Sequence, residues 1–278
     1  MLKISTEEFK IWAQYIYSIS GIDLDISKSY LLETRFLPLL QETGSNNFSE
    51  LYFKVKADVK DNLRQKIINL ITTNETLFFR DSSPFELLKN KIIPDLLDFK
   101  KQHKLRPELR IWSAACSTGQ EVYSIIIALK ELLGDLHKYN LQIMATDISN
   151  RVVTQASAGK FSKLEIARGL PNEMLSKYFI QAGEYWKIKD ELRFLSTFKT
   201  MNLMGDIWAL GKFDVIFCRN VAIYFNEKDK KNLFDKIAKM FNSGGALVIG
   251  STESITGICP QFESLRYLRS VYYQVKGV

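Results

Sequence analysis

The sequence predicts an α/β fold in which an N-terminal helical domain precedes a doubly wound, mostly parallel sheet. Two observations predict it. From Leu109 onward, short apolar runs alternate with stretches of helical periodicity, which is the pattern of parallel strands joined by helices. Residues 1–72 instead carry their apolar positions at helical spacing. The chain has 278 residues, 46% of them hydrophobic, which is enough for one large or two modest domains.

The helical domain is expected over residues 1–72. Ser5 and Glu8 form a capping-box pattern at the start of its first helix, and Gly21 is expected to end that helix. A second helix is expected over residues 29–42, bent or delayed by Pro38. Shorter helices are expected over residues 48–57 and 59–71. Residues 73–108 are then expected to form a linker and a connecting helix, with Ser83 as the N-cap.

Residues 109–278 are expected to form the sheet domain. Its strands are predicted over residues 109–112, 141–146, 213–218 and 246–250, with an edge hairpin around 269–275. A hairpin of residues 184–188 and 192–198 predicts a small inserted β subdomain at about residues 180–200. A helix capped by Asn226 is expected to continue to Phe241, where Gly244 and Gly245 would end it.

The segment from Ile111 to Leu129 is the most informative part of the chain. A short apolar strand leads into a loop of small residues, Ala114–Gly119, and Glu121 then opens a helix. Such a turn lets a ligand lie against backbone N–H groups at the positive end of a helix. An ordinary strand–loop–helix connection has the same pattern, so this segment alone leaves both interpretations open.

Asp147 ends the next predicted strand. An acidic residue at this position of a doubly wound fold binds the hydroxyl pair of a ribose, although Asp147 is also placed to cap the following helix. The chain has no G-x-G-x-x-G motif for a pyrophosphate, which argues against a dinucleotide. A nucleoside without phosphates fits better, and S-adenosylmethionine is the commonest one.

Several longer motifs are more specific. They are NETLFFRD (74–81), AACSTGQEVYS (114–124), ATDIS (145–149), ARGLP (167–171), FDVIFCRNVAIYF (213–225) and GALVIGSTES (245–254). In this order they resemble the CheR-type chemotaxis receptor methyltransferases, most weakly before about residue 60. The resemblance implies a class I S-adenosylmethionine-dependent methyltransferase that converts glutamate side chains of receptors to methyl esters in sensory adaptation. The product of the cofactor would be S-adenosylhomocysteine, and no metal is implied.

The resemblance also implies roles for individual residues. The cofactor-binding residues would be Asn74, Thr76, Arg80, Glu121, Asp147, Asn202, Leu203, Arg219 and Asn220. The catalytic residues would be Arg80, Arg219 and Tyr224. Glu121 would take the ammonium group of the cofactor, although its simpler role is that of an acidic first-turn residue. For Arg80 the simpler role is a structural contact, either an ion pair with Asp81 or a hydrogen bond to a C-terminal carbonyl.

Two features depart from the family pattern. Gln120 and Val122 stand where the G-E-E-P-Y run of the family has glutamate and proline, and only Glu121 is retained. The loop that carries a glycine-rich, peptide-docking insert in some relatives is reduced here to Gln181–Glu184, with Gly183 as its only glycine. So short a loop predicts that receptors are methylated without capture of a C-terminal tail peptide.

The composition and the net charge limit the kinds of partner that the protein could bind. The net charge of +7 favours an acidic partner, but no run of Lys and Arg is long enough for a nucleic-acid-binding arm. The resemblance implies the cytoplasmic helical domains of chemotaxis receptors as partners, met by Lys28 and Arg35. The protein is expected to be a monomer.

No apolar run approaches the ~18 residues of a membrane span, so we expect a cytoplasmic protein without membrane insertion. Cys116, Cys218 and Cys259 lack disulfide or zinc spacing and are expected to be reduced and buried.

Two other functions remain open. A methyltransferase of the same fold could act on RNA or on another protein, which the basic charge would suit. Base-methylating members usually carry N/D-P-P-Y after the fourth strand, whereas this chain has Arg219-Asn220-Val221-Ala222. The second alternative is a non-catalytic module that senses S-adenosylmethionine, and the presence of Arg80, Arg219 and Tyr224 argues against it.

Overall fold

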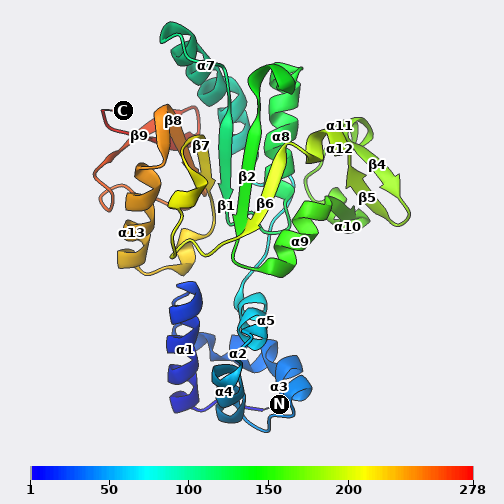
Figure 1. Cartoon of the computed structure of the whole chain (residues 1–278), viewed down its shortest axis with the longest axis vertical. Coiled ribbons are helices and arrows are strands. Elements are labelled where there is room, and N and C mark those ends of the chain that lie inside the picture. The colour runs from blue at the N-terminus through cyan, green and yellow to red at the C-terminus, as the bar shows by residue number, and fades with distance from the viewer. Residues whose placement is uncertain (1, 278) are drawn as a thin grey trace.

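The computed structural model describes residues 2–277 as two lobes, a helical domain and a larger sheet domain, joined by a narrow connection (Figure 1). The helical lobe contains α1 (Thr6–Ser20), α2 (Ser29–Arg35), α3 (Leu37–Thr43), α4 (Phe48–Ala57) and α5 (Asn62–Ile71). A short 3-10 turn, Ile26–Lys28, precedes α2. None of the helices within residues 2–277 has the length and apolar character needed to span a membrane.

The helical domain is held by an aromatic core and by its helix caps. Trp12 and Phe36 are fully buried at its centre, with ring centroids 4.9 Å apart. Ser5 forms the predicted capping box, and Gly21 ends α1 in the left-handed conformation, as predicted. The bend expected at Pro38 is a break between two helices at Phe36, because proline is favoured in the first turn of a new helix.

The sheet domain contains seven strands in the order β6-β2-β1-β7-β8-β10-β9. They are β1 (Arg110–Ala114), β2 (Gln142–Asp147), β6 (Ser196–Thr200), β7 (Phe213–Cys218), β8 (Phe241–Ile249), β9 (Phe262–Tyr267) and β10 (Ser270–Val275). The first five strands in this order, β6, β2, β1, β7 and β8, are parallel to one another. Strand β10 is antiparallel to β8, and β9 is antiparallel to β10. Successive residues of β1 face two separate hydrophobic cores, because Ile111 belongs to one core and Trp112 belongs to the other. The doubly wound sheet is therefore confirmed.

Helices cover both faces of this sheet. They include α8 (Gln120–Leu133), α9 (Asn150–Ala158) and α13 (Glu227–Ala238), with 3-10 turns at Leu136–Tyr139, Trp208–Leu210 and Ala222–Tyr224. From the linker, α6 (Ser83–Leu87), a π-helical turn (Leu88–Ile92) and α7 (Ile93–Gln102) form one continuous connecting helix that packs on α8, β8 and β10. Its N-cap is Ser82, one residue before the predicted Ser83.

The inserted β subdomain differs from the predicted hairpin. β4 (Phe179–Ala182) and β5 (Tyr185–Ile188) form an antiparallel pair, and β3 (Lys160–Ser162) pairs with the other edge of β5. Three short helices accompany them: α10 (Lys163–Ala167), α11 (Asn172–Tyr178) and α12 (Asp190–Arg193). The predicted second arm, residues 192–198, is wrong, because Leu192 lies in α12 and β6 joins the main sheet beside β2.

The helix predicted to reach Phe241 ends earlier. α13 begins after its predicted cap, Asn226, but stops at Ala238, and Phe241 is already the first residue of β8. Gly244 and Gly245 lie inside β8, where the register with β7 shifts. A Cβ on Gly245 would come within 2.7 Å of the Phe241 ring, so this bulge requires a glycine.

The amino ends of the central strands are tied together by a buried ion pair. Lys100 Nζ of α7 lies 2.8 Å from Asp214 Oδ1 of β7, and the two side chains are 9% and 1% exposed. Asp214 Oδ1 also accepts from the Asn242 amide at 3.0 Å, and its Oδ2 accepts from the backbone N–H of Arg110 at 2.8 Å. Three strands and the connecting helix thus meet at one satisfied carboxylate.

Candidate functional site

A cavity lies between the helical domain and the carboxyl ends of β1, β2 and β7. The carboxyl ends of parallel strands, where the chain order reverses, are the usual ligand site of doubly wound folds. All of the residues predicted for the site line this cavity: Asn74, Thr76, Arg80, Glu121, Asp147, Asn202, Leu203, Arg219, Asn220 and Tyr224. The fold therefore brings together side chains that are up to 150 positions apart in the sequence.

Asp147, the last residue of β2, is almost completely buried in the cavity wall. Its Oδ2 accepts from the backbone N–H of Ser117 at 2.9 Å, and its Oδ1 accepts from that of Ser149 at 3.0 Å. Burial raises the pKa of Asp147, and backbone N–H groups offset part of that rise. Ser149, not Asp147, caps α9, so the simpler role considered for Asp147 is wrong.

The loop between β1 and α8 has an unusual backbone. Ala115, Ser117 and Gly119 have φ angles of 62°, 50° and 95°, a region that is unfavourable for alanine and serine. The Ser117 N–H is directed at Asp147, and its hydroxyl donates to the Asn74 carbonyl at 2.8 Å. A Cβ on Gly119 would approach α9 to 2.9 Å. The small residues thus let the loop pack tightly between α9 and the linker.

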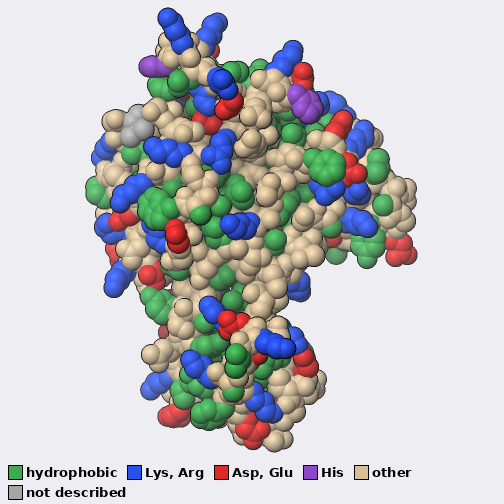
Figure 2. All heavy atoms as spheres, in the orientation of Figure 1, with side chains coloured by type: hydrophobic (Ala, Val, Ile, Leu, Met, Phe, Trp, Pro, Cys, Tyr) green, Lys and Arg blue, Asp and Glu red, His purple; other side chains and the backbone are tan. Residues whose placement is uncertain are grey.

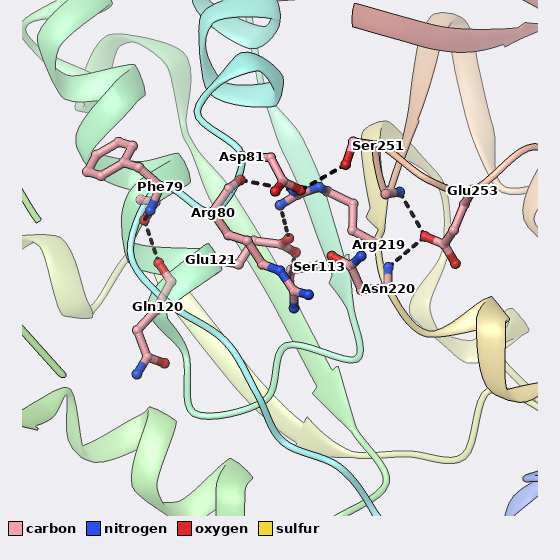
Figure 3. Close-up of polar contacts among 12 residues, drawn as sticks. Phe79, Arg80, Asp81, Ser113, Gln120, Glu121, Arg219, Asn220, Ser251 and Glu253 are labelled. Carbon is pink, nitrogen blue, oxygen red and sulfur yellow. Dashed lines mark hydrogen bonds and ion pairs between the residues drawn. The ribbon is translucent and has the colours of Figure 1, made fainter. Parts of the chain in front are cut away.

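Glu121 and Arg219 form an ion pair at the centre of the site (Figure 3). Arg219 Nη1 donates to Glu121 Oε2 at 3.0 Å, and the Ser113 hydroxyl donates to the other oxygen at 2.8 Å. Arg219 Nη2 donates to the Asp81 carboxylate at 2.8 Å and to the Arg80 carbonyl at 2.9 Å. The Arg219 side chain is only 1% exposed. These contacts favour a role in holding Glu121 and the linker, while contact of Arg219 with the cofactor stays a prediction.

Arg80 is a half-buried cation on the cavity wall. Its Nη1 donates to the Glu75 carbonyl at 2.9 Å. The ion pair considered between Arg80 and Asp81 is not formed within residues 2–277, because Asp81 pairs with Arg219. Asp81 and Ser82 have φ angles of 66° and 38°, which turn the linker sharply beside Arg80. The Arg80 guanidinium is therefore available to bind a carboxylate.

Asn74 and Thr76 lie on the linker between the two domains. Both are half-buried, and the Asn74 amide donates to the Thr72 hydroxyl at 3.4 Å. The Asn74 carbonyl is bound by the loop that follows β1. The linker and this loop therefore form one continuous part of the cavity wall.

Asn202 and Leu203 follow β6 and line another part of the wall. Leu203 is buried, while the Asn202 Nδ2 donates to the Ile19 carbonyl of α1 at 3.1 Å. The Asn202 Oδ1 accepts from the backbone N–H of Met204 at 2.9 Å. One N–H and one lone pair of the Asn202 amide remain for the predicted contact with adenine. Asn202 also joins the two domains, which the sequence does not indicate.

The segment after β7 carries Asn220 and Tyr224. Asn220 has a left-handed backbone with a φ of 57°, and Tyr224 ends a 3-10 turn. The Tyr224 carbonyl accepts from the backbone N–H of Asp23 in the helical domain at 3.0 Å. Its hydroxyl has no hydrogen-bond partner among residues 2–277, so it is free to meet a bound group.

Two groups of residues contribute to the site without having been predicted to do so: residues of the helical domain, and Glu253. The helical domain lines the cavity with Ile22 and Asp23 from the loop after α1, Lys28 from the 3-10 turn and Tyr30 from α2, and none of them lies in a motif. Glu253 contacts the backbone of the site, and it lies within the quoted GALVIGSTES motif. The GALVIGSTES motif was a usable signal for Glu253. Of the helical-domain residues only Lys28 was singled out in the sequence, as a contact for the receptor and not as part of the cavity wall.

Comparison with known families agrees with this geometry. A model described as "CheR methyltransferase, SAM binding domain" matches residues 74–270. A second, described as "CheR methyltransferase, all-alpha domain", matches residues 7–72. The chain belongs to the CheR methyltransferase family.

Similar proteins align with this CheR-family chain over nearly its whole length. It is 38% identical to chemotaxis protein methyltransferase Cher2 of Pseudomonas putida, over 97% of both chains. It is 35% identical to chemotaxis protein methyltransferase 1 of Pseudomonas aeruginosa, over 99% of this chain and 100% of the relative. Identity to chemotaxis protein methyltransferase 1 of Vibrio cholerae is 37%, over 99% of each. The sheet domain is therefore the S-adenosylmethionine-binding domain of a class I methyltransferase, and the resemblance inferred from the motifs is confirmed.

Proposed function

We propose that this CheR-family protein transfers the methyl group of S-adenosylmethionine to glutamate side chains of chemotaxis receptors, forming methyl esters. The observation that carries the proposal is the charge arrangement of one cavity. Glu121 and Asp147, two of the four acidic residues that line it, lie there together with the Arg80 guanidinium, whose partner within residues 2–277 is a carbonyl and not a carboxylate. Acidic groups suit the hydroxyl and ammonium groups of the cofactor, and a guanidinium suits a carboxylate.

The cavity residues fit S-adenosylmethionine. Each oxygen of Asp147 keeps a free lone pair for a ribose hydroxyl beside its backbone hydrogen bond. Glu121 keeps acceptor capacity for an ammonium group, and Leu203 offers an apolar surface to adenine. The bound cofactor would supply a methyl group whose bond to sulfur breaks as a carboxylate oxygen takes it, with the electron pair left on sulfur.

The residues of the chain have to align the acceptor, not to move a proton. A glutamate side chain has a pKa of about 4.3 and is already ionised at neutral pH, so it needs no general base. Both histidines, His103 and His137, are exposed on the surface and do not line the cavity. Arg80 and the free hydroxyl of Tyr224 are the groups that would orient the carboxylate, and such positioning can supply most of the rate.

A nucleic-acid acceptor is less well supported than a protein carboxylate. On the face shown in Figure 2, the Lys and Arg side chains are spread among Asp and Glu and form no continuous basic patch. The residues after β7 also lack the N/D-P-P-Y sequence of base-methylating enzymes. The names of the relatives, all chemotaxis protein methyltransferases, favour a receptor as the acceptor and the cytoplasm as the place of the reaction.

Recruitment without a receptor tail is part of the proposal. Only Gly183 and Glu184 separate β4 from β5, which leaves little room for a peptide to approach the turn closely. Arg35, which we expected to meet the receptor, donates to the last two carbonyls of α5 at 3.3 and 2.8 Å. Lys28 is exposed on the helical domain and lines the cavity, and it is the stronger candidate for docking.

Transfer of a labelled methyl group to a receptor cytoplasmic fragment tests the proposed reaction. We expect incorporation that mild alkali releases as methanol, because a methyl ester is alkali-labile. A fragment whose labelled glutamates are replaced by alanine is the control and should take up no label. An alkali-stable product would contradict glutamate methylation, and cofactor binding without transfer would support the sensing module.

Removal of the last residues of the receptor tests recruitment. We expect the truncated fragment to be methylated within about twofold of the full fragment, and isolated tail peptides not to bind. A large loss of rate together with micromolar peptide binding, about −8 kcal/mol, would show that a tail is used.

A further inference from the structure

Glu253 joins the ends of two strands beside the site. It lies in the turn that follows β8, and a single oxygen, Oε2, accepts two backbone hydrogen bonds (Figure 3). The donors are the N–H of Gly250 at 2.8 Å and the N–H of Asn220 at 2.6 Å. The carboxylate therefore connects the residue after β8 to the segment that follows β7.

This contact stabilises the backbone conformation of Asn220. Its φ of 57° lies in the left-handed region, which asparagine adopts more readily than other residues with a side chain but less readily than the right-handed region, so a hydrogen bond to its N–H helps to hold it there. Gly250 leaves the space for this conformation. A Cβ there would lie 2.5 Å from Glu253 Oε2, 2.8 Å from Asn220 Nδ2 and 3.2 Å from the backbone nitrogen of Asn220. Glu253 and Gly250 thus impose the position of Asn220 from two sides.

The segment Asn220–Tyr224 is held at both ends. Glu253 binds its first residue, and the backbone N–H of Asp23 binds the carbonyl of its last. Asn220 and Tyr224 both line the cavity, and neither Glu253 nor Gly250 does. Glu253 therefore acts on the cavity only through this segment.

We propose that Glu253 is a positioning residue for the acceptor half of the site, which sets the place of Asn220 and Tyr224 relative to Arg80. The inference rests on the proposed methyl transfer. The second oxygen, Oε1, is buried and has no hydrogen-bond partner within residues 2–277. The positioning role therefore uses Oε2 alone, and glutamine, whose amide oxygen can accept both backbone bonds, should replace Glu253.

The experiment compares Glu253→Met, Glu253→Gln and Gly250→Ala, with Glu263→Met on the exposed face of β9 as the matched control. Three kinds of measurement are made on each full-length variant. Steady-state kinetics give kcat and KM for methylation of a receptor fragment, calorimetry gives the Kd of S-adenosylmethionine, and hydrogen exchange follows the backbone amides of residues 219–224.

We expect Glu253→Met and Gly250→Ala to lower kcat by about 10- to 100-fold, the effect of a displacement near 1 Å at a reacting centre. The Kd of the cofactor should rise by a smaller factor, because Asn220 is the only predicted cofactor contact in the displaced segment Asn220–Tyr224. Exchange of the Asn220 amide should become faster in both. Glu253→Gln and Glu263→Met should match the wild type in every measurement.

Three results would overturn the inference: wild-type kcat in Glu253→Met, loss of kcat in Glu253→Gln equal to that in Glu253→Met, or unchanged exchange at Asn220 in Glu253→Met. A wild-type protein that binds the cofactor but does not methylate the fragment would refute the proposed function instead. The exchange measurement would still decide in that case whether Glu253 positions the segment.

Discussion

Two buried ion networks lie at opposite ends of the same sheet, and they differ in how completely their polar atoms are satisfied. At the amino ends of the strands, both oxygens of Asp214 are bound, by Lys100, Asn242 and the backbone of Arg110. At the carboxyl ends, Arg219 binds Glu121 and Asp81, but its Nε is buried with no partner within residues 2–277.

The backbone differs in the same way. Six non-glycine residues with positive φ surround the carboxyl-end network: Phe79, Asp81, Ser82, Ala115, Ser117 and Asn220. The other four in the described residues, Asp61, Lys104, Asn140 and Leu268, all lie in exposed turns. Strained backbone and unsatisfied buried atoms are stabilised only by their surroundings, and they gather where a ligand binds. We therefore propose that the amino-end network serves stability and that the carboxyl-end network serves the proposed reaction.

The largest expected effect is on stability at the amino end. Lys100→Met leaves the Asp214 carboxylate, 1% exposed, without its cation, and should lower the free energy of unfolding by about 3–5 kcal/mol. Urea denaturation measures this, with Lys101→Met, on the exposed side of α7, as the control. A loss below about 1 kcal/mol would show that the pair is dispensable.

Removal of the cation at the carboxyl end should cost less stability. Arg219→Met leaves Asp81 and Glu121, whose side chains are 34% and 13% exposed, so water can solvate them. We expect a loss of about 1–3 kcal/mol, with Arg266→Met on β9 as the exposed control. A loss equal to that of Lys100→Met would remove the distinction between the two networks.

The pH dependence of cofactor binding tests the role of Asp147, which lies at the carboxyl end of the sheet. Its pKa is raised by burial, and the ionised form of the carboxylate is the one that could accept a hydrogen bond from each of the two ribose hydroxyls that we propose it binds. Affinity for S-adenosylmethionine should therefore be full at pH 7 and fall as the pH drops through this raised pKa, earlier than for an exposed aspartate. Calorimetry from pH 7 to pH 5 measures it. Asp147→Ala should weaken binding by about 1–3 kcal/mol and flatten this dependence, and an unchanged slope would assign the titration to another group.

The smallest expected effect is at Tyr224. Tyr224→Phe removes one hydroxyl that has no partner within residues 2–277, so the free energy of unfolding should not change. Turnover should fall by up to about tenfold, the contribution of one hydrogen bond, and by less than in Arg80→Ala. Steady-state methylation measures it, with Tyr185→Phe on β5 as the exposed control. Wild-type turnover in Tyr224→Phe would assign no catalytic role to the hydroxyl.

The sequence predicts what is local. The caps at Ser5, Gly21 and Asn226 are found where expected, because a helix end depends on a few neighbouring residues. The alternation of apolar and polar residues after Leu192 predicted the second strand of a hairpin. Such a pattern indicates a strand but not the strand with which it pairs, and the pairing of β6 with β2 is long-range. The two glycines after α13 suggested a helix end, although they form a bulge that only the neighbouring β7 requires.

In the site, too, long-range contacts could not be predicted from the sequence. Its residues could be named from motifs, but their partners could not. Arg219 is 98 and 138 positions from Glu121 and Asp81, so nothing in the sequence indicates that one guanidinium serves both. Asp214 lies within the FDVIFCRNVAIYF motif, but Lys100 belongs to no motif, and nothing in the sequence indicates that the two side chains form a pair.

The most direct test of the division between the two ends is the single-turnover rate of methyl transfer. It is measured for Lys100→Met and Arg219→Met with saturating cofactor and receptor fragment, at a temperature where both variants are folded. Lys100→Met should retain the wild-type rate despite its larger loss of stability, and Arg219→Met should lose about 100-fold because Glu121 and the linker are displaced. Equal losses in the two variants, or a wild-type rate in Arg219→Met, would contradict the account.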